Sequence, residues 1–181
     1  RMDAKVFGYA LGQFSLGFGE RKVSSSTMTR CRDTAREIKL EMIPWENPGF
    51  ALSGILGDES PYFGRVSERM ALANKGNYRD ALNEYFRMGH QQGFNDLAEA
   101  TDKLEKYIWA SYSRIDLPLH VMVTHDINVG CFLAGQGVIK QFDESTWPHY
   151  LDAAVGFLDR YGRVRYGYMR YYENKCYPFD C

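Results

Sequence analysis

Two short polar stretches follow apolar runs in this sequence, and their side chains could carry out anion and acid–base chemistry. In "SSSTMTR", Ser25 and Ser26 precede Arg30 by five and four residues. In "VTHDIN", His125 and Asp126 stand side by side at the end of an apolar run. Ionisable groups are costly to bury unless they are paired or have a chemical role. These two stretches are therefore the candidate functional residues.

The first stretch suits anion binding. We expect Arg30 in the first turn of a helix, where its guanidinium fork could bind two oxygens of a phosphate group. The backbone N–H groups and the dipole at the helix N-terminus would add to the attraction. The alternative interpretation is that Arg30 lies on a solvated helix face.

The second stretch could supply a hydrogen bond and a proton. The His125 imidazole can hydrogen-bond an anion, and the Asp126 carboxyl group can donate a proton to a leaving group. In the alternative interpretation, Asp126 caps a helix and His125 is a satisfied core residue. Neither stretch alone decides between chemistry and structure.

Both stretches are expected where a strand ends. The pattern predicts a strand in "RKVSSST" and then a helix over 28–42, with Thr27 or Ser26 as its N-cap. After a proline, "LPLHVMVTH" is typical of a central parallel strand, and a helix over 127–134 follows it. Because ligands bind at the carboxyl ends of parallel strands, the two loops could converge on one site.

The other elements continue an alternation of helices and strands. In chain order they are a helix over 4–14, an irregular connection over 44–64, helical segments over 66–88 and 95–113, and a hairpin over 153–172. This order predicts an α/β fold, with a three-layer α/β/α sandwich on a mostly parallel central sheet and a helical cap insertion over 44–116. The length of 181 residues fits a single domain, 1–181.

Charge and hydropathy exclude two classes of partner. Lys and Arg number 22 and Asp and Glu number 23, so the broad positive surface of a nucleic-acid binder is not expected. No apolar run approaches the roughly 20 residues that span a bilayer, so we expect no membrane span. The first residue is Arg, so an upstream segment is expected, and the sequence leaves the cellular compartment open.

The four cysteines do not form a metal-binding pattern. Cys31 and Cys131 are expected to be small buried residues. Cys176 and Cys181 could form a disulfide in an oxidising compartment, or they could be two reduced thiols near the end of the sequence. Because no zinc-ligand spacing occurs, we expect neither a metal nor a cofactor.

Taken together, the two stretches resemble the histidine phosphatase superfamily, which includes phosphoglycerate mutases and histidine acid phosphatases. "SSSTMTRCRDTARE" is similar to the signature Ser-Ser-Pro-x-x-Arg-x-x-x-Thr-Ala, with Thr27 in place of proline. "THDINVGCFLAG" resembles the His-Asp-x-Asn form of the acid phosphatase branch, through His125, Asp126 and Asn128. The resemblance covers most of the chain, and residues 44–116 match only as a variable cap would.

The resemblance implies hydrolysis of a small phosphorylated substrate, a phosphomonoester, through a phosphohistidine intermediate and without a metal. In that scheme Arg30 and His125 bind the phosphoryl group and Asp126 protonates the leaving oxygen. The implied catalytic residues are His125 and Asp126, and the implied substrate-binding residues are Arg30, Ser26, Ser25 and Asn128, the last of which would brace the loop.

One part of the family pattern is absent. The family's nucleophile lies in an Arg-His-Gly motif, and this tripeptide does not occur in the sequence. Of the other histidines, His90, His120 and His149, none follows an arginine or precedes a glycine. An omitted N-terminal strand or a fragment is the favoured explanation, because loss of a central parallel strand would leave backbone groups unpaired. The alternatives are a non-catalytic phospholigand-binding relative and a structural domain with coincidental motifs.

Overall fold

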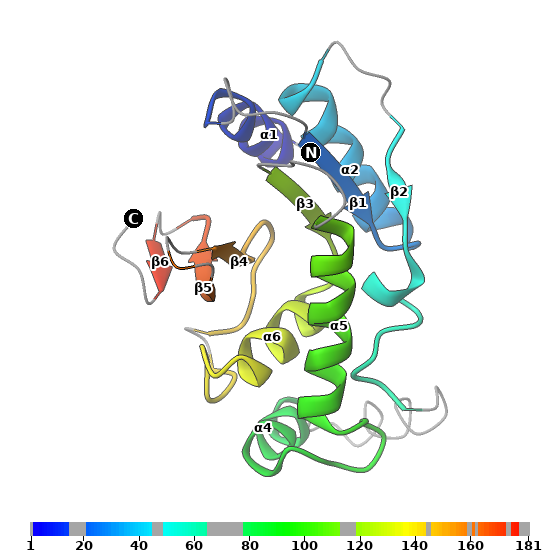
Figure 1. Ribbon diagram of the computed structural model, residues 1–181, viewed down its shortest axis with the longest axis vertical. Coiled ribbons are helices and arrows are strands. Elements are labelled where there is room, and N and C mark those ends of the chain that lie inside the picture. Colours follow the sequence, from blue (N-terminus) through cyan, green and yellow to red (C-terminus); the bar gives the residue numbers. More distant parts are fainter. Residues whose placement is uncertain are drawn as a thin grey trace. The chain divides into compact units, whose positions relative to one another are not determined.

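The structure is a computed structural model, and two compact units are distinguished within it. The described residues are 2–14, 21–44, 49–64, 78–112, 119–143, 146–158, 161, 163–172 and 175–177. The first unit comprises residues 1–60 and 105–125, and the second comprises residues 61–104 and 126–181. Figure 1 labels the helices and strands of both units.

The first unit is built on a parallel sheet. Its elements are α1 (Met2–Phe14), β1 (Arg21–Ser25), α2 (Thr29–Met42), β2 (Ala51–Leu52), the 3-10 helix η1 (Gly54–Leu56) and β3 (Leu119–Val123), together with the second half of α5 (Leu97–Tyr112). The strand order is β2-β1-β3, and both pairings are parallel. The predicted α/β fold class and the predicted strands around both polar stretches are therefore confirmed.

The two faces of this sheet differ in chemistry. The register pairs Val23 with Val121 and Lys22 with His120, so alternate residues separate an apolar face from a polar one. The apolar face belongs to a core that contains Val23, Ala35, Met42, Ile43, Leu11, Phe50, Leu119, Val121 and Val123. Because α2 contributes Ala35 and Met42 to this core, the helix that carries Arg30 is fixed against the strands (Figure 1).

Two glycines explain how α1 lies so close to α2. A Cβ atom added at Gly8 would lie 2.5 Å from the carbonyl oxygen of Ile38 and 2.8 Å from its Cα. A Cβ atom added at Gly12 would lie 3.1 Å from the carbonyl oxygen of Met42 and 3.2 Å from its Cα. Glycine weakens an isolated helix, but at these positions it permits contact between the two helix backbones. The predicted helix over 4–14 is confirmed despite its glycines.

The second unit combines helices with an antiparallel sheet. It contains α4 (Tyr78–Met88), the first half of α5, α6 (Asp126–Gly135), β4 (Ala153–Leu158), β5 (Val164–Arg170) and β6 (Lys175–Tyr177). The strand order is β4-β5-β6, with antiparallel pairing throughout. The predicted terminal hairpin is confirmed.

Aromatic side chains form much of the interior of the second unit. The rings of Tyr85 and Phe94 stack with centroids 4.6 Å apart, and Phe132 meets Tyr166 edge-on at 5.0 Å. Burial is the main reason that the pKa of Tyr85 is raised. Tyr85 therefore packs as a neutral residue and is not available for acid–base chemistry.

The predicted cap of α2 is wrong. Met28 is the N-cap residue, and its side chain makes no capping hydrogen bond. The Ser26 hydroxyl accepts a hydrogen bond from the Met28 backbone N–H, while the Thr27 hydroxyl donates to Asp58. The hydroxyl groups of Ser26 and Thr27, three and two residues before the helix begins at Thr29, are thus both engaged in other hydrogen bonds.

Other sequence predictions are resolved in part. Cys31 and Cys131 are buried free thiols, as expected. Residues 66–77 of the predicted helical segment and Cys181 lie outside the described residues. No helix within the described ranges is long and apolar enough to cross a membrane.

We predict that Gly8→Ala lowers the free energy of unfolding by about 1–3 kcal/mol, because the new methyl group would meet the Ile38 backbone. Gly12→Ala should cost less, since its contacts are longer. Urea denaturation of both variants measures the effect. At an unobstructed helical site the same change would stabilise by about 0.5–1 kcal/mol, so stabilisation at Gly8 would contradict the close helix crossing.

A second prediction concerns His120 on the polar face of the sheet. Burial, with a contribution from Lys22, lowers the pKa of His120 from 6.5 to about 4. Because the folded state disfavours the protonated ring, this contribution to stability is complete above about pH 6.5 and is lost as the pH falls to about 4. Between these pH values the free energy of unfolding of the wild-type protein should fall by roughly 1–2 kcal/mol more than that of His120→Gln, which has no ring to protonate. The difference is no larger because the half-buried ring is partly screened by solvent. Equal pH dependence in the two proteins would contradict it.

Candidate functional site

Ser26, Arg30 and His125 come together at the carboxyl ends of β1 and β3 in the first unit. Arg30 Nη2 lies 2.9 Å from His125 Nδ1, and Ser26 Oγ lies 3.2 Å from His125 Nε2. The Ser26 backbone N–H donates to the Val123 carbonyl at 2.9 Å, which continues the parallel pairing one residue beyond the strands. The pairing of β1 with β3 therefore sets the position of the two loops.

The contact with Arg30 fixes which nitrogen of His125 carries hydrogen. A guanidinium group is a donor only, so Nδ1 must accept, and in the neutral ring the hydrogen is on Nε2. Nε2–H can then donate to Ser26 Oγ, which also accepts from the Met28 backbone N–H at 3.1 Å. Protonation at Nδ1 would place two donors against each other, so Arg30 would have to turn away from the ring.

Two residues that the sequence analysis did not select as site residues lie beside His125 and Ser26. Cys31 Sγ lies 3.7 Å from Nδ1 and 3.8 Å from Nε2, and this thiol is buried. A Cβ atom at Gly57 would lie 2.9 Å from Ser26 Oγ, so the loop after η1 passes directly against the serine. Cys31 could have been found from the sequence, because it directly follows Arg30. The approach of Gly57 to Ser26 depends on the tertiary structure and could not have been found in this way.

The remaining serines of the stretch turn toward the protein. Ser25 is fully buried, and its hydroxyl donates to the Ser26 carbonyl at 2.9 Å. Ser24 Oγ lies 2.7 Å from His120 Nε2, a part-buried pair that the sequence analysis did not anticipate. Register arithmetic could have found it, because His120 and Lys22 are partners and Ser24 lies on the same face.

Asp126 and Asn128 belong to the second unit. Asp126 is the first residue of α6 and is half-buried, and it follows His125 directly in the chain. Asn128 lies on the same helix and is 3% exposed. Of the predicted site residues, three have side chains in contact in the structure: Ser26, Arg30 and His125. Asp126 is adjacent to His125 in the chain.

This arrangement can bind an anion. Arg30 is exposed in the first turn of α2, where the helix N-terminus also favours negative charge. Its contact with Nδ1 uses one donor group of a guanidinium that has five N–H bonds in all. An oxyanion beside Arg30 could also accept from His125 once the ring is protonated or turned. Among the described residues, no group of three or more His, Cys, Asp or Glu side chains could hold a metal ion.

Comparisons with known proteins add two similar structures. No model of a known protein family and no curated protein matches the chain. The native structure of a mycobacterial glucosyl-3-phosphoglycerate phosphatase is 16% identical, covers 92% of this chain and 82% of its own, and has a TM-score of 0.49. Bacillus stearothermophilus YhfR is 13% identical, covers 92% and 81%, and has a TM-score of 0.49. Because these similarities are modest, the functional proposal rests on the residues of this chain.

We predict that Arg30→Gln weakens the binding of vanadate at least about tenfold, because a bidentate charge-assisted contact is lost. Isothermal titration calorimetry measures the affinity. The matched control is Arg32→Gln, which removes another exposed arginine from the same helix and should leave the affinity unchanged. Equal losses in the two variants would show that the general charge of α2, and not Arg30, attracts the anion.

Proposed function

We propose that this chain belongs to a phosphatase of the histidine phosphatase type and hydrolyses a small phosphomonoester. The observation that carries the proposal is the contact of Arg30 with His125, 2.9 Å long, at the carboxyl ends of two paired parallel strands. An arginine, an imidazole and a helix N-terminus meet at that edge. This combination suits a dianionic phosphoryl group, whose transfer depends chiefly on positioning and charge stabilisation.

In the proposed reaction, Arg30 binds two phosphoryl oxygens and His125 donates a hydrogen bond to the group as it is transferred. The P–O bond to the leaving group breaks while a histidine nitrogen forms a P–N bond. Asp126 gives its proton to the leaving oxygen, so the alcohol departs neutral. Water then attacks the phosphohistidine, with the Asp126 carboxylate as the base, and inorganic phosphate is released. Ser26 orients His125, and Asn128 supports the loop.

The nucleophile is a separate part of the proposal. We propose that a histidine on a further parallel strand, absent from the 181 residues, supplies it. The edge strand β3 supports this idea. Among the described residues it is hydrogen-bonded to a strand on one side, yet its sequence "LHVMV" is almost entirely apolar and half-buried. Such a strand is typical of the interior of a parallel sheet.

A second candidate function is phosphate or phospholigand binding without catalysis. The observation that favours it is the absence of the Arg-His-Gly motif from the sequence, while Arg30, Ser26 and His125 are arranged for an anion. In this case the protein would bind vanadate through Arg30 and would not turn over a phosphomonoester.

We predict that the protein, if catalytic, hydrolyses p-nitrophenyl phosphate in EDTA and that His125→Ala lowers kcat at least about a hundredfold. His90→Ala removes an exposed histidine and should have no effect. Asp126→Asn should also lower kcat, because an amide cannot give a proton to the leaving oxygen; an unchanged kcat in this variant would remove Asp126 from the role of proton donor.

An intact mass of the same sample separates the two candidate functions. Turnover that depends on His125 in a sample heavier than the 181 residues would mean that an additional segment supplies the nucleophile. If the mass matches the 181 residues and no turnover occurs, catalysis by this chain is refuted. Vanadate binding that depends on Arg30 would then establish the binding function.

A further inference from the structure

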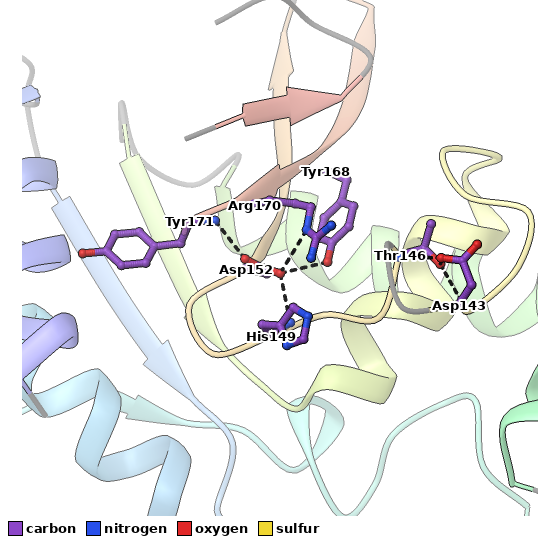
Figure 2. A network of polar contacts seen from close by, with 7 residues as sticks. All are labelled: Asp143, Thr146, His149, Asp152, Tyr168, Arg170 and Tyr171. Carbon is purple, nitrogen blue, oxygen red and sulfur yellow. Dashed lines mark hydrogen bonds and ion pairs between the residues drawn. The ribbon is translucent and has the colours of Figure 1, made fainter. Parts of the chain in front are cut away.

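The second unit contains a loop that is held by a buried carboxylate (Figure 2). Asp152 precedes β4, and its side chain is 2% exposed. It accepts hydrogen bonds from the backbone N–H of His149 at 2.9 Å, the hydroxyl of Tyr168 at 2.9 Å and the backbone N–H of Tyr171 at 2.8 Å. Arg170 Nε lies 3.8 Å from the same carboxylate. Asp152 thus joins the loop to β5 and the residue that follows it.

The same loop has a strained backbone. Leu151 has a φ angle of 68°, and it is the single non-glycine residue with positive φ among those described. A leucine in this conformation costs roughly 1–2 kcal/mol, so the surrounding structure must fix it. The Asp152 backbone N–H donates to the His149 carbonyl at 3.1 Å, and the Asp152 carboxylate accepts from the His149 N–H, so the turn is closed from both directions.

Trp147 is fixed just before this turn. Its backbone N–H donates to the Asp143 carbonyl at 3.0 Å, and its ring lies 4.8 Å from that of Phe142. Asp143 and Thr146 also exchange hydrogen bonds, with each backbone N–H donating to the other's side chain at 2.9 Å (Figure 2). Trp147 and His149 are therefore presented by a segment with a defined conformation.

His149 borders two cavities in the second unit. The larger has a volume of about 410 Å³ and is lined by Tyr78, Arg79, Trp147 and His149. The smaller, of about 310 Å³, is lined by His149, Asp152, Arg170 and Tyr172. Both volumes are near the lower end of the range of small-molecule sites, roughly 300–1,000 Å³.

The charges at the two cavities differ. In the smaller cavity, the positive charge of Arg170 faces the Asp152 carboxylate. In the larger cavity, Arg79 is exposed on the first turn of α4, and no ion pair joins it to a carboxylate in the described part of the chain. The larger cavity therefore combines two aromatic walls with an arginine and an imidazole, and it has the more positive character.

We propose that the larger cavity is a second binding site, for a small aromatic anion. The flat ring of the ligand packs against Tyr78 and Trp147, and its phosphate or carboxylate group binds Arg79 and His149. This site is independent of the proposed phosphatase function, because it uses none of the residues given a role there, which are Ser26, Arg30, His125, Asp126 and Asn128.

The test uses the protein labelled with 5-fluorotryptophan and observed by ¹⁹F nuclear magnetic resonance. The chain has three tryptophans, and Trp147→Phe identifies the signal of Trp147. Titration with phenylphosphonate, which is not hydrolysed, should shift this signal in a saturable way. The apparent Kd should rise about tenfold in Arg79→Gln, because the charge-assisted contact is lost.

Matched controls make the result specific. Arg87→Gln, which changes an exposed arginine in the last turn of α4, should leave the Kd unchanged. Arg30→Gln should also leave it unchanged, which separates this site from the one in the first unit. Phenol lacks the charge and methylphosphonate lacks the ring, so both should bind more weakly than phenylphosphonate. A separate titration with benzoate compares a carboxylate group with the phosphonate group.

Three results would overturn the proposal. The Trp147 signal could stay in place throughout the phenylphosphonate titration, or it could shift with the same Kd in Arg79→Gln. Phenol could also bind as tightly as phenylphosphonate, which would show an apolar cavity without anion recognition.

Discussion

The candidate site in the first unit depends on the parallel pairing of β1 with β3. Five registered pairs, from Arg21 with Leu119 to Ser25 with Val123, bring two segments separated by about a hundred residues to a common edge. A one-residue slip would reverse the faces of one strand, exposing Val121 and burying His120 in the apolar core. It would also separate the loop of Ser26 from that of His125. The apolar core of the sheet and the geometry of the candidate site are thus consequences of one register.

The polar face of this sheet carries buried serine hydroxyl groups, and the neighbouring segment supplies a hydrogen-bond partner for each of them. Ser24 and Ser26 are almost fully buried, and each hydroxyl group lies within hydrogen-bonding distance of a histidine on the neighbouring segment. A buried hydroxyl group without a hydrogen-bond partner would lower the free energy of unfolding by roughly 1–3 kcal/mol. The serine–histidine contacts therefore stabilise the fold as well as orient the histidine rings. The two histidines nevertheless differ. His120 is confined within a strand and kept neutral, whereas His125 follows the strand and contacts an exposed arginine.

The second unit uses a comparable arrangement in a different context. Asp152 satisfies two backbone N–H groups and a tyrosine hydroxyl, and it faces an arginine from β5. In both units a buried polar group holds a loop where a strand begins or ends, and the loop carries a histidine. His125 contacts Arg30, whereas His149 lines one cavity with Arg79 and another with Arg170. Such loops are suitable for binding because the rigid strands limit their motion while their side chains remain accessible.

The sequence by itself determined the local elements and the candidate residues. Hydrophobic periodicity predicted the strands around Ser25 and His125, the helices after them and the terminal hairpin, since these patterns follow from the repeats of helix and strand. Residue chemistry selected Arg30 and His125. Only the tertiary structure decided which atoms meet: the contact of Arg30 with Nδ1, the pair of Ser24 and His120, the approach of Gly57 to Ser26 and the cavities beside His149. The physical reason is that these contacts depend on strand register and side-chain packing between distant segments, which no local pattern of residues encodes.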